Sequence, residues 1–116
     1  MAYAMSVMRD RIPADTKMFC GHEYTTSNLA FCQLADPTNA SIPAKSAEVA
    51  ALKAVGWASV PTTVTEERSY NVFMRCFDAD VQKLAGFEGD AVKTIAFLRA
   101  FKNTGKRPTP DEVAKL

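Results

Sequence analysis

The chain has 116 residues, of which 47% are hydrophobic and 23% are charged, and 14 basic against 13 acidic residues give a formal net charge of +1. This length provides for one domain with a core of its own and little more, and the composition excludes a disordered or fibrous protein. The balanced charge excludes a general attraction to nucleic acid or to anionic lipid. No stretch approaches the roughly 20 apolar residues that a membrane span needs.

The first part of the sequence predicts a helix, a short strand and a second helix. Apolar residues at spacings of three and four favour a helix over residues 2–11. The apolar run at 17–20 is typical of a short buried strand. Thr25 or Thr26 can cap the next helix, which we expect to end at about residue 35, before an Asp-Pro pair.

The rest of the sequence has helical periodicity. Helices are expected at 43–55, around Glu66 and Glu67, at 79–85 and at 91–103, with a frayed turn at 111–116. Residues 60–63 form an extended link, and Thr63 or Thr65 can cap the short helix that follows, as Asp90 can cap the last long one. The buried stripe of that last helix is expected to consist of Val92, Ile95, Ala96 and Leu98.

The only histidine, His22, limits the chemistry that the chain can carry. A zinc site of three His, or of two His and a carboxylate, cannot be completed, and a Ser-His-Asp or Cys-His mechanism has one available base. His22 follows a predicted strand and Gly21, which places it where α/β proteins usually form their sites. A structural hydrogen bond to a neighbouring carbonyl is the alternative, and position alone does not decide between the two.

The three cysteines, Cys20, Cys32 and Cys76, are too few and too far apart for a disulfide framework. We interpret them as reduced thiols of an intracellular protein, with the cytosol as the expected compartment, or an organelle if the true start lies upstream. Cys20, His22 and Cys32 are three soft ligands, but a fourth ligand and paired spacing are missing. Buried thiols are therefore preferred to a small structural zinc site.

Arg99 and Lys102 lie three residues apart in the last long predicted helix, and therefore on one face. A solvated basic stripe is the ordinary interpretation of this spacing. The functional interpretation is a clamp for a ligand with separated carboxylates, because Arg offers a bidentate fork and Lys a point charge. Tyr24 can add a phenolic donor to such a site or be a half-buried loop residue, and Phe101 is expected to pack inward.

Several blocks of the sequence together resemble one enzyme family. The blocks are Cys20-Gly21-His22-Glu23-Tyr24-Thr25, Asn28-Leu29-Ala30-Phe31, Asp36-Pro37-Thr38-Asn39, Val60-Pro61-Thr62-Thr63, Glu66-Glu67, Asn71-Val72-Phe73-Met74-Arg75, and the pair Arg99 and Lys102. They follow the order of that family and cover nearly the whole chain. On these residues, the chain resembles the carboxyl-terminal portion of glyoxalase II, hydroxyacylglutathione hydrolase, a member of the metallo-β-lactamase superfamily.

The resemblance implies a mainly α fold with a short α/β segment. Residues 1–39 would form the carboxyl-terminal edge of a metallo-β-lactamase αββα sandwich, and residues 40–116 the family's helical carboxyl-terminal domain. The family hydrolyses the thioester S-D-lactoylglutathione to glutathione and D-lactate with two zinc or iron ions, for which His22 would be one metal ligand. The substrate-binding residues implied are His22, Glu23, Tyr24, Arg99 and Lys102.

The sequence departs from the family in its metal ligands. The Thr-His-x-His-x-Asp-His run, a further His and the bridging Asp are absent, and Val72 replaces the Pro usually found before Phe73. One imidazole does not hold a metal usefully. We therefore expect the chain to be one part of such an enzyme, as a truncated gene product, an incomplete gene model or a fragment. We expect that it does not hydrolyse the thioester alone. The alternatives are a non-catalytic glutathione-binding or interaction module and a chain completed in trans by a separately encoded amino-terminal half.

The strand at 17–20 is expected to lack a partner within the chain. Its backbone groups, and the apolar faces of helices 2–11 and 26–35, would then be exposed. This arrangement predicts poor solubility, or self-association through that surface.

Overall fold

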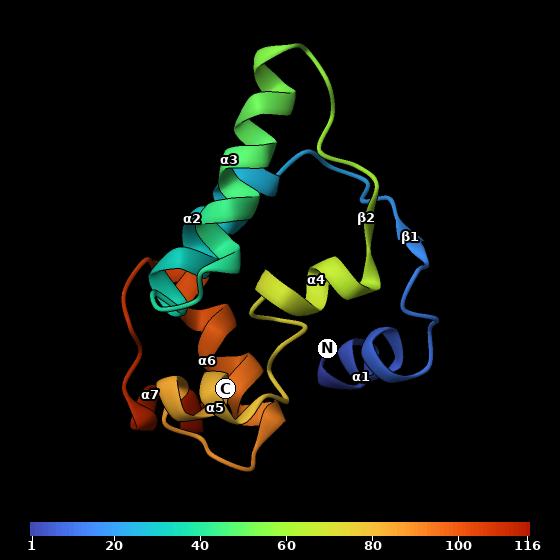
Figure 1. The fold of residues 1–116 in the computed structure, drawn as a ribbon. Coiled ribbons are helices and arrows are strands. Elements are labelled where there is room, and N and C mark those ends of the chain that lie inside the picture. The colour runs from blue at the N-terminus through green and yellow to red at the C-terminus, as the bar shows by residue number, and fades with distance from the viewer.

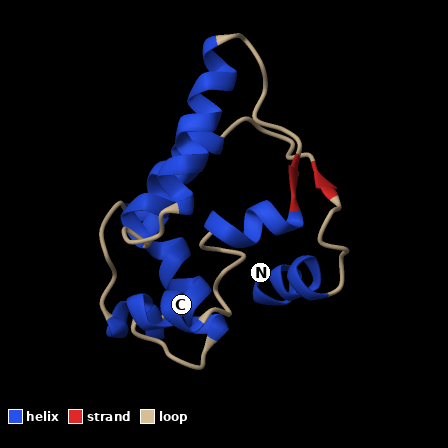
Figure 2. Cartoon of the chain, in the orientation of Figure 1, coloured by secondary structure: helices blue, strands red, loops and turns tan.

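The computed structural model describes residues 1–116 and consists mainly of helices, with one pair of very short strands (Figures 1 and 2). The elements are α1 (Ala2–Asp10), β1 (Lys17–Met18), α2 (Thr25–Ala35), α3 (Ser41–Ala54), β2 (Thr62–Thr63), α4 (Val64–Tyr70), α5 (Ala79–Ala85), α6 (Ala91–Thr104) and α7 (Pro110–Ala114). The predicted mainly α class is confirmed. None of the helices combines the length and the apolar character needed to cross a membrane.

The helix starts follow from local side-chain chemistry. Thr63 forms a capping box with Glu66 at the start of α4, and the Asp90 carboxylate accepts from the Lys93 backbone N–H at the start of α6, so both predicted caps are confirmed. The predicted cap of α2 was wrong, because the helix follows Tyr24 without a side-chain cap. Thr25 instead shares a hydrogen bond with Ser59, with 2.6 Å between the hydroxyl oxygens.

The short strand has a partner, which corrects the prediction that it lacks one. β1 pairs antiparallel with β2, with Lys17 opposite Thr63 and Met18 opposite Thr62. The partner comes from the segment predicted as an extended link, whose β-branched threonines favour a pleated backbone. Phe19 and Cys20 lie beyond the pairing and are exposed. This pair is the whole sheet of the described chain, so the αββα sandwich stays a prediction.

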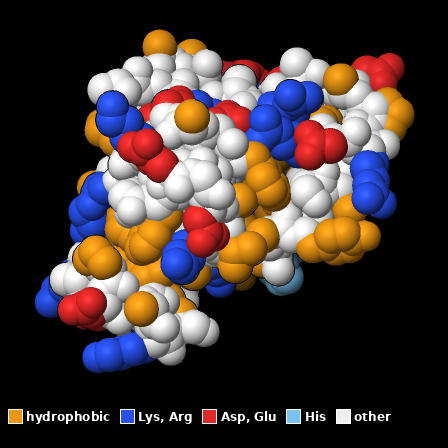
Figure 3. All heavy atoms as spheres, turned by 90° about the horizontal axis from the view of Figure 1, so that it is seen from below, with side chains coloured by type: hydrophobic (Ala, Val, Ile, Leu, Met, Phe, Trp, Pro, Cys, Tyr) orange, Lys and Arg blue, Asp and Glu red, His pale blue; other side chains and the backbone are white.

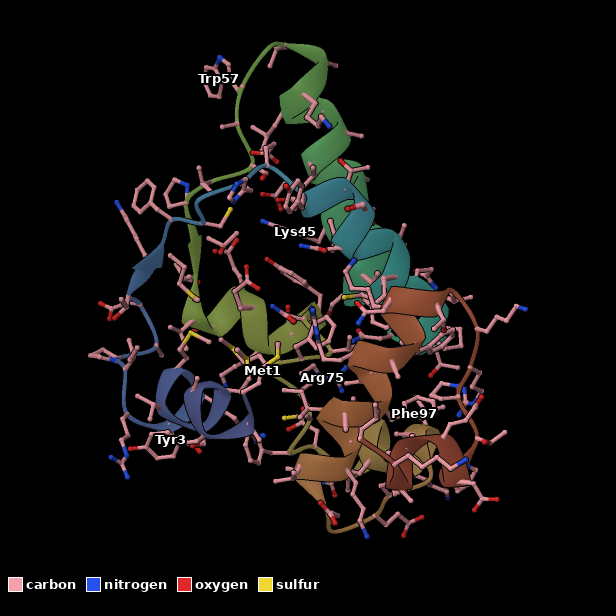
Figure 4. All side chains as sticks on the ribbon, turned by 180° about the vertical axis from the view of Figure 1, so that it is seen from behind. Met1, Tyr3, Lys45, Trp57, Arg75 and Phe97 are labelled. Carbon is pink, nitrogen blue, oxygen red and sulfur yellow. The ribbon has the colours of Figure 1, made fainter.

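The helices α2 and α3 lie side by side, and each buries several of its residues (Figure 1). The buried residues of α2 are Leu29, Phe31, Cys32 and Ala35, and those of α3 are Ile42, Lys45 and Val49. The expectation that helix 26–35 exposes its apolar face was therefore wrong. The same expectation fails in part for α1, which has no fully buried residue but packs Ala2 and Met5 against the core, while its Tyr3 points outward (Figure 4). The division of the chain at residue 39 stays a prediction.

The helix α6 carries the aromatic centre of the core. Its buried residues are Thr94, Ile95, Phe97, Leu98 and Phe101, so Ile95, Leu98 and Phe101 are placed as predicted. Val92 was predicted to be buried but is 66% exposed. The reason is that the buried stripe runs through Phe97 and Phe101, whose rings pack edge to face with 5.9 Å between centroids. Arg99 and Lys102 of the same helix line a cleft together with residues of β1 and α4.

Candidate functional site

A cleft of about 340 Å³ lies between β1, with the residues that follow it, and helices α2, α4 and α6. Its apolar lining comes from Met18, Phe19, Leu29, Val60 and Phe73. Its polar lining comes from Cys20, Thr25, Asn28, Cys32, Ser59, Thr62, Glu67, Tyr70, Asn71, Arg99 and Lys102. Clefts of roughly 300–1,000 Å³ with an apolar body and a few polar groups are the usual form of small-molecule sites. The cleft therefore has the size and lining of a ligand site.

Arg99 and Lys102 line this cleft together. The guanidinium of Arg99 lies 5.8 Å from the centroid of the Phe73 ring, and the Lys102 ammonium lies 5.4 Å from that of Phe31. Such cation–π contacts hold the side chains in place without neutralising their charge. Neither cation takes part in any of the ion pairs of the structure. Two positive charges are thus available to an anionic ligand.

The loop between β1 and α2 places its functional candidates differently. His22 and Tyr24 are exposed and stack on each other, with ring centroids 5.2 Å apart and an interplanar angle of 11°. Neither side chain lines the cleft, whereas Cys20, which precedes them, does. Figure 3 shows the imidazole, drawn in pale blue, at the surface. The structure thus brings Arg99 and Lys102 together and leaves His22, Glu23 and Tyr24 outside the cleft.

Glu23 anchors this loop to the segment that precedes β2. Its carboxylate accepts hydrogen bonds from both the hydroxyl and the backbone N–H of Ser59. The hydroxyl bond is the largest cause of a lowered pKa of Glu23, since it favours the charged form. Glu23 was predicted as a substrate-binding residue. In this structure its carboxylate fixes the loop on which His22 and Tyr24 lie.

Four polar residues of the cleft were missed by sequence reasoning. The Glu67 carboxylate accepts from the hydroxyls of Thr62 and Tyr70, at 2.7 Å each, and from the side-chain amide of Asn71 at 2.8 Å. Burial and the neighbouring Glu67 charge raise the pKa of Tyr70, so its hydroxyl remains a donor. The spacing of Glu67 to Tyr70 and Asn71, three and four residues, was the available signal.

The residues present do not fit a dinuclear metal centre. No three His, Cys, Asp or Glu side chains lie close enough together to hold a metal ion. All three cysteines are unpaired; Cys32 is buried as predicted and Cys76 is buried too, whereas Cys20, also predicted to be buried, is exposed. Burial raises the pKa of the Cys32 thiol, which disfavours the thiolate that a metal requires. The assignment of His22 as a zinc ligand stays a prediction from resemblance.

Comparisons with known proteins relate the chain to one group of enzymes. Residues 23–105 match the family model described as hydroxyacylglutathione hydrolase C-terminus. A hydroxyacylglutathione hydrolase of Rhodopseudomonas palustris is 38% identical over 93 residues, which cover 79% of this chain and 36% of the relative. The enzyme of that name from Rhodospirillum rubrum is 41% identical over 93 residues, with the same coverage, 79% and 36%. That from Shewanella oneidensis is 48% identical over 64 residues, 55% of this chain and 24% of the relative. The chain thus spans about a third or less of these relatives' length.

Proposed function

The chain belongs to the hydroxyacylglutathione hydrolase family, and we propose that it is the carboxyl-terminal part of such an enzyme, in which it binds the glutathione moiety of the thioester substrate. The complete reaction would be hydrolysis of S-D-lactoylglutathione to glutathione and D-lactate. The proposal places the chain in a reducing compartment such as the cytosol, which agrees with its three free thiols.

The observation that carries this proposal is the pairing of Arg99 and Lys102 in one cleft, with neither charge neutralised. Glutathione is a short peptide with two separated carboxylates. Arg99 supplies a planar fork that suits a carboxylate, and Lys102 supplies a second positive charge three residues further along α6. The apolar lining, including Phe19 and Leu29, suits the uncharged middle of the peptide and its acyl group.

These residues bind and orient a ligand but do not form a hydrolytic centre. His22 is the one side chain suited to act as a base near neutral pH, and it lies outside the cleft lining. Since no metal-binding set is present, we derive no hydrolytic step from the described residues. We therefore propose that the 116-residue chain alone does not hydrolyse the thioester.

Calorimetry with glutathione tests the binding proposal. The chain should bind glutathione saturably, and Arg99→Ala or Lys102→Ala should weaken binding about tenfold each, the loss expected for a charge-assisted hydrogen bond. Arg68→Ala is the matched control, because Arg68 is exposed and forms no ion pair. The absence of heat at millimolar glutathione would contradict the proposal.

The activity proposal has its own test. The purified chain, incubated with zinc or iron, should release thiol from S-D-lactoylglutathione no faster than buffer does. Turnover above background that is lost in His22→Ala would refute the proposal that the chain alone is inactive.

A second candidate function is that of a chain whose site is completed in trans by a separately encoded amino-terminal half. Exposed aromatic side chains favour it: Phe19 is 70% exposed, Tyr24 60% and Trp57 69%, and Trp57 projects from the loop after α3 (Figure 4). Such a surface is typical of association, with a second chain or a second copy. Co-expression with a chain that carries the family's missing metal ligands should then raise the bound metal above background.

A further inference from the structure

The cleft that holds Arg99 and Lys102 also holds one acidic side chain, Glu67. Like the two cations, Glu67 forms no ion pair in the structure. The cleft therefore presents two positive charges and one negative charge, none of them neutralised by another residue. An uncompensated charge in a cleft favours a ligand of the opposite charge at that place.

Glu67 is held in a fixed orientation by neutral donors. Thr62 and Tyr70 both donate to its Oε1 atom, and Asn71 donates to Oε2. A carboxylate has about four acceptor positions, so three are used and one on Oε2 remains. Because burial and Glu67 keep Tyr70 protonated, its hydroxyl donates to Oε1 rather than competing for a cation. The remaining acceptor is thus preorganised for one further donor.

Glu67 and Lys102 have opposite effects on the pKa of one thiol, that of Cys32. Burial is the main cause that raises this pKa; the negative charge of Glu67 raises it further, and the positive charge of Lys102 lowers it. Cys32 itself lines the cleft. Glu67, Lys102 and Cys32 thus line one cleft of about 340 Å³, a size that suits a small zwitterionic peptide.

We propose that Glu67 binds the ammonium group of the thiol carrier and so selects a carrier with a free amine. The proposal rests on the proposed function, since it assigns the third charge of the same ligand. Glutathione carries two carboxylates and one ammonium group, which match Arg99, Lys102 and Glu67 in number and sign. Glu67 is a specificity-determining residue in this assignment, and Thr62, Tyr70 and Asn71 are positioning residues that act through it.

The test compares two ligands on the unchanged chain by calorimetry: glutathione, and its deaminated form, glutaryl-cysteinyl-glycine, which keeps both carboxylates. The chain should bind glutathione about tenfold more tightly, as expected for one charge-assisted hydrogen bond. Glu67→Gln should bring this ratio close to one by weakening the binding of glutathione alone. Glu88→Gln, which removes the same charge at an exposed position with no hydrogen bond or ion pair, should keep the ratio.

The outcomes separate this inference from the function on which it rests. If both ligands bind equally to the unchanged chain and Arg99→Ala weakens both, the assignment of Glu67 is wrong and the proposed function stands. If neither ligand binds, both proposals fail. Should Glu67→Gln not fold, as judged by circular dichroism, the comparison of the two ligands on the unchanged chain still decides.

Discussion

Arg75 donates a hydrogen bond to the buried carboxylate of Asp36, 39 residues away in the chain, with 2.5 Å between Nη1 and Oδ2. The Asp36 side chain is 3% exposed, and Figure 4 shows Arg75 in the middle of the molecule. Arg75 also pairs with Asp78 and Asp80. This one guanidinium therefore joins the end of α2 to the segment that leads into α5.

The first prediction concerns this ion pair. Arg75→Met leaves the Asp36 carboxylate buried without its cation, and removal of one partner of a buried pair costs about 3–5 kcal/mol. The expected result is a large fall in the urea midpoint, or unfolding without urea, measured by circular dichroism. Arg68→Met is the control and should stay within about 0.5 kcal/mol of the unchanged chain, since Arg68 is exposed. Equal midpoints for the two variants would show that the pair contributes nothing.

Local features of the fold could be predicted from the sequence. The caps formed by Thr63 and Asp90 depend on side chains within three residues of the backbone that they satisfy. The end of α5 at Gly86 depends on a left-handed backbone, with φ of 81°, which glycine adopts without strain. Such signals lie within a few residues of the feature that they specify, so the predicted helix bounds agree closely with those of the structure.

Features that join distant segments could not be predicted in the same way. The pairing of β1 with β2 brings together residues 46 positions apart, Lys17 and Thr63, and the apolar run that predicted the first strand carries no signal for its partner. The prediction that His22 and Glu23 share a site with Arg99 came from the family resemblance alone, whereas the sequence by itself also allowed Tyr24 as a donor to that site. Periodicity gave no means to foresee that the imidazole faces solvent while Cys20 lines the cleft.

The second prediction concerns acid stability. Burial alone would raise the pKa of Glu66, but hydrogen bonds from Thr63 and Lys45 lower it below the ordinary 4.5. A lowered folded pKa stabilises the fold above pH 4.5, and this contribution is lost as the pH falls through the folded value. Glu66→Gln should therefore be less stable than the unchanged chain at neutral pH.

The gap in stability between the unchanged chain and Glu66→Gln should narrow as the pH falls below 4.5. Urea unfolding at a series of pH values measures the gap. Glu88→Gln, at an exposed position, should show no comparable narrowing. A gap for Glu66→Gln that stays constant with pH would contradict the assigned role of its hydrogen bonds.

The third prediction concerns the anchor of the loop that carries His22. Ser59→Ala removes the hydroxyl that donates to Glu23, the largest cause of its lowered pKa. The pKa of Glu23 should therefore rise toward the ordinary value of 4.5. A carboxyl-carbon NMR titration measures it, and Ser27→Ala is the control, because Ser27 donates only to the Tyr24 carbonyl. An unchanged Glu23 titration in Ser59→Ala would disprove the anchor.

The fourth prediction concerns the thiols. Burial raises the pKa of Cys76 to about 11, and its side chain is fully enclosed. Cys32 is also buried with a raised pKa, whereas Cys20 is exposed. At about pH 8, a thiol reagent should therefore modify only Cys20 rapidly in the folded chain, and all three cysteines when the chain is unfolded in urea. Cys20→Ser should abolish the rapid phase, and a rapid phase that persists in this variant would contradict the assignment.

The last prediction concerns α1, which contacts the rest of the molecule with no buried residue of its own. Ala2 and Met5 of this helix pack against the core, and Arg9 pairs with Asp78 at 2.9 Å and lies 5.5 Å from the Phe77 ring centroid. A partly exposed ion pair of this kind contributes about 1 kcal/mol. Since regions with few buried contacts open first, the amides of α1 should exchange with solvent much faster than those of α6.

Arg9→Gln should increase the exchange rate of the α1 amides roughly fivefold, the factor that corresponds to about 1 kcal/mol, and leave the α6 amides unchanged. Hydrogen exchange followed by mass spectrometry measures both helices in one experiment. Arg11→Gln is the matched control, because Arg11 is exposed, forms no ion pair and lies just beyond the end of α1. If the two variants accelerate α1 equally, net charge rather than the Arg9 contact governs its attachment. If α6 accelerates as much as α1, the helix opens only with the whole domain.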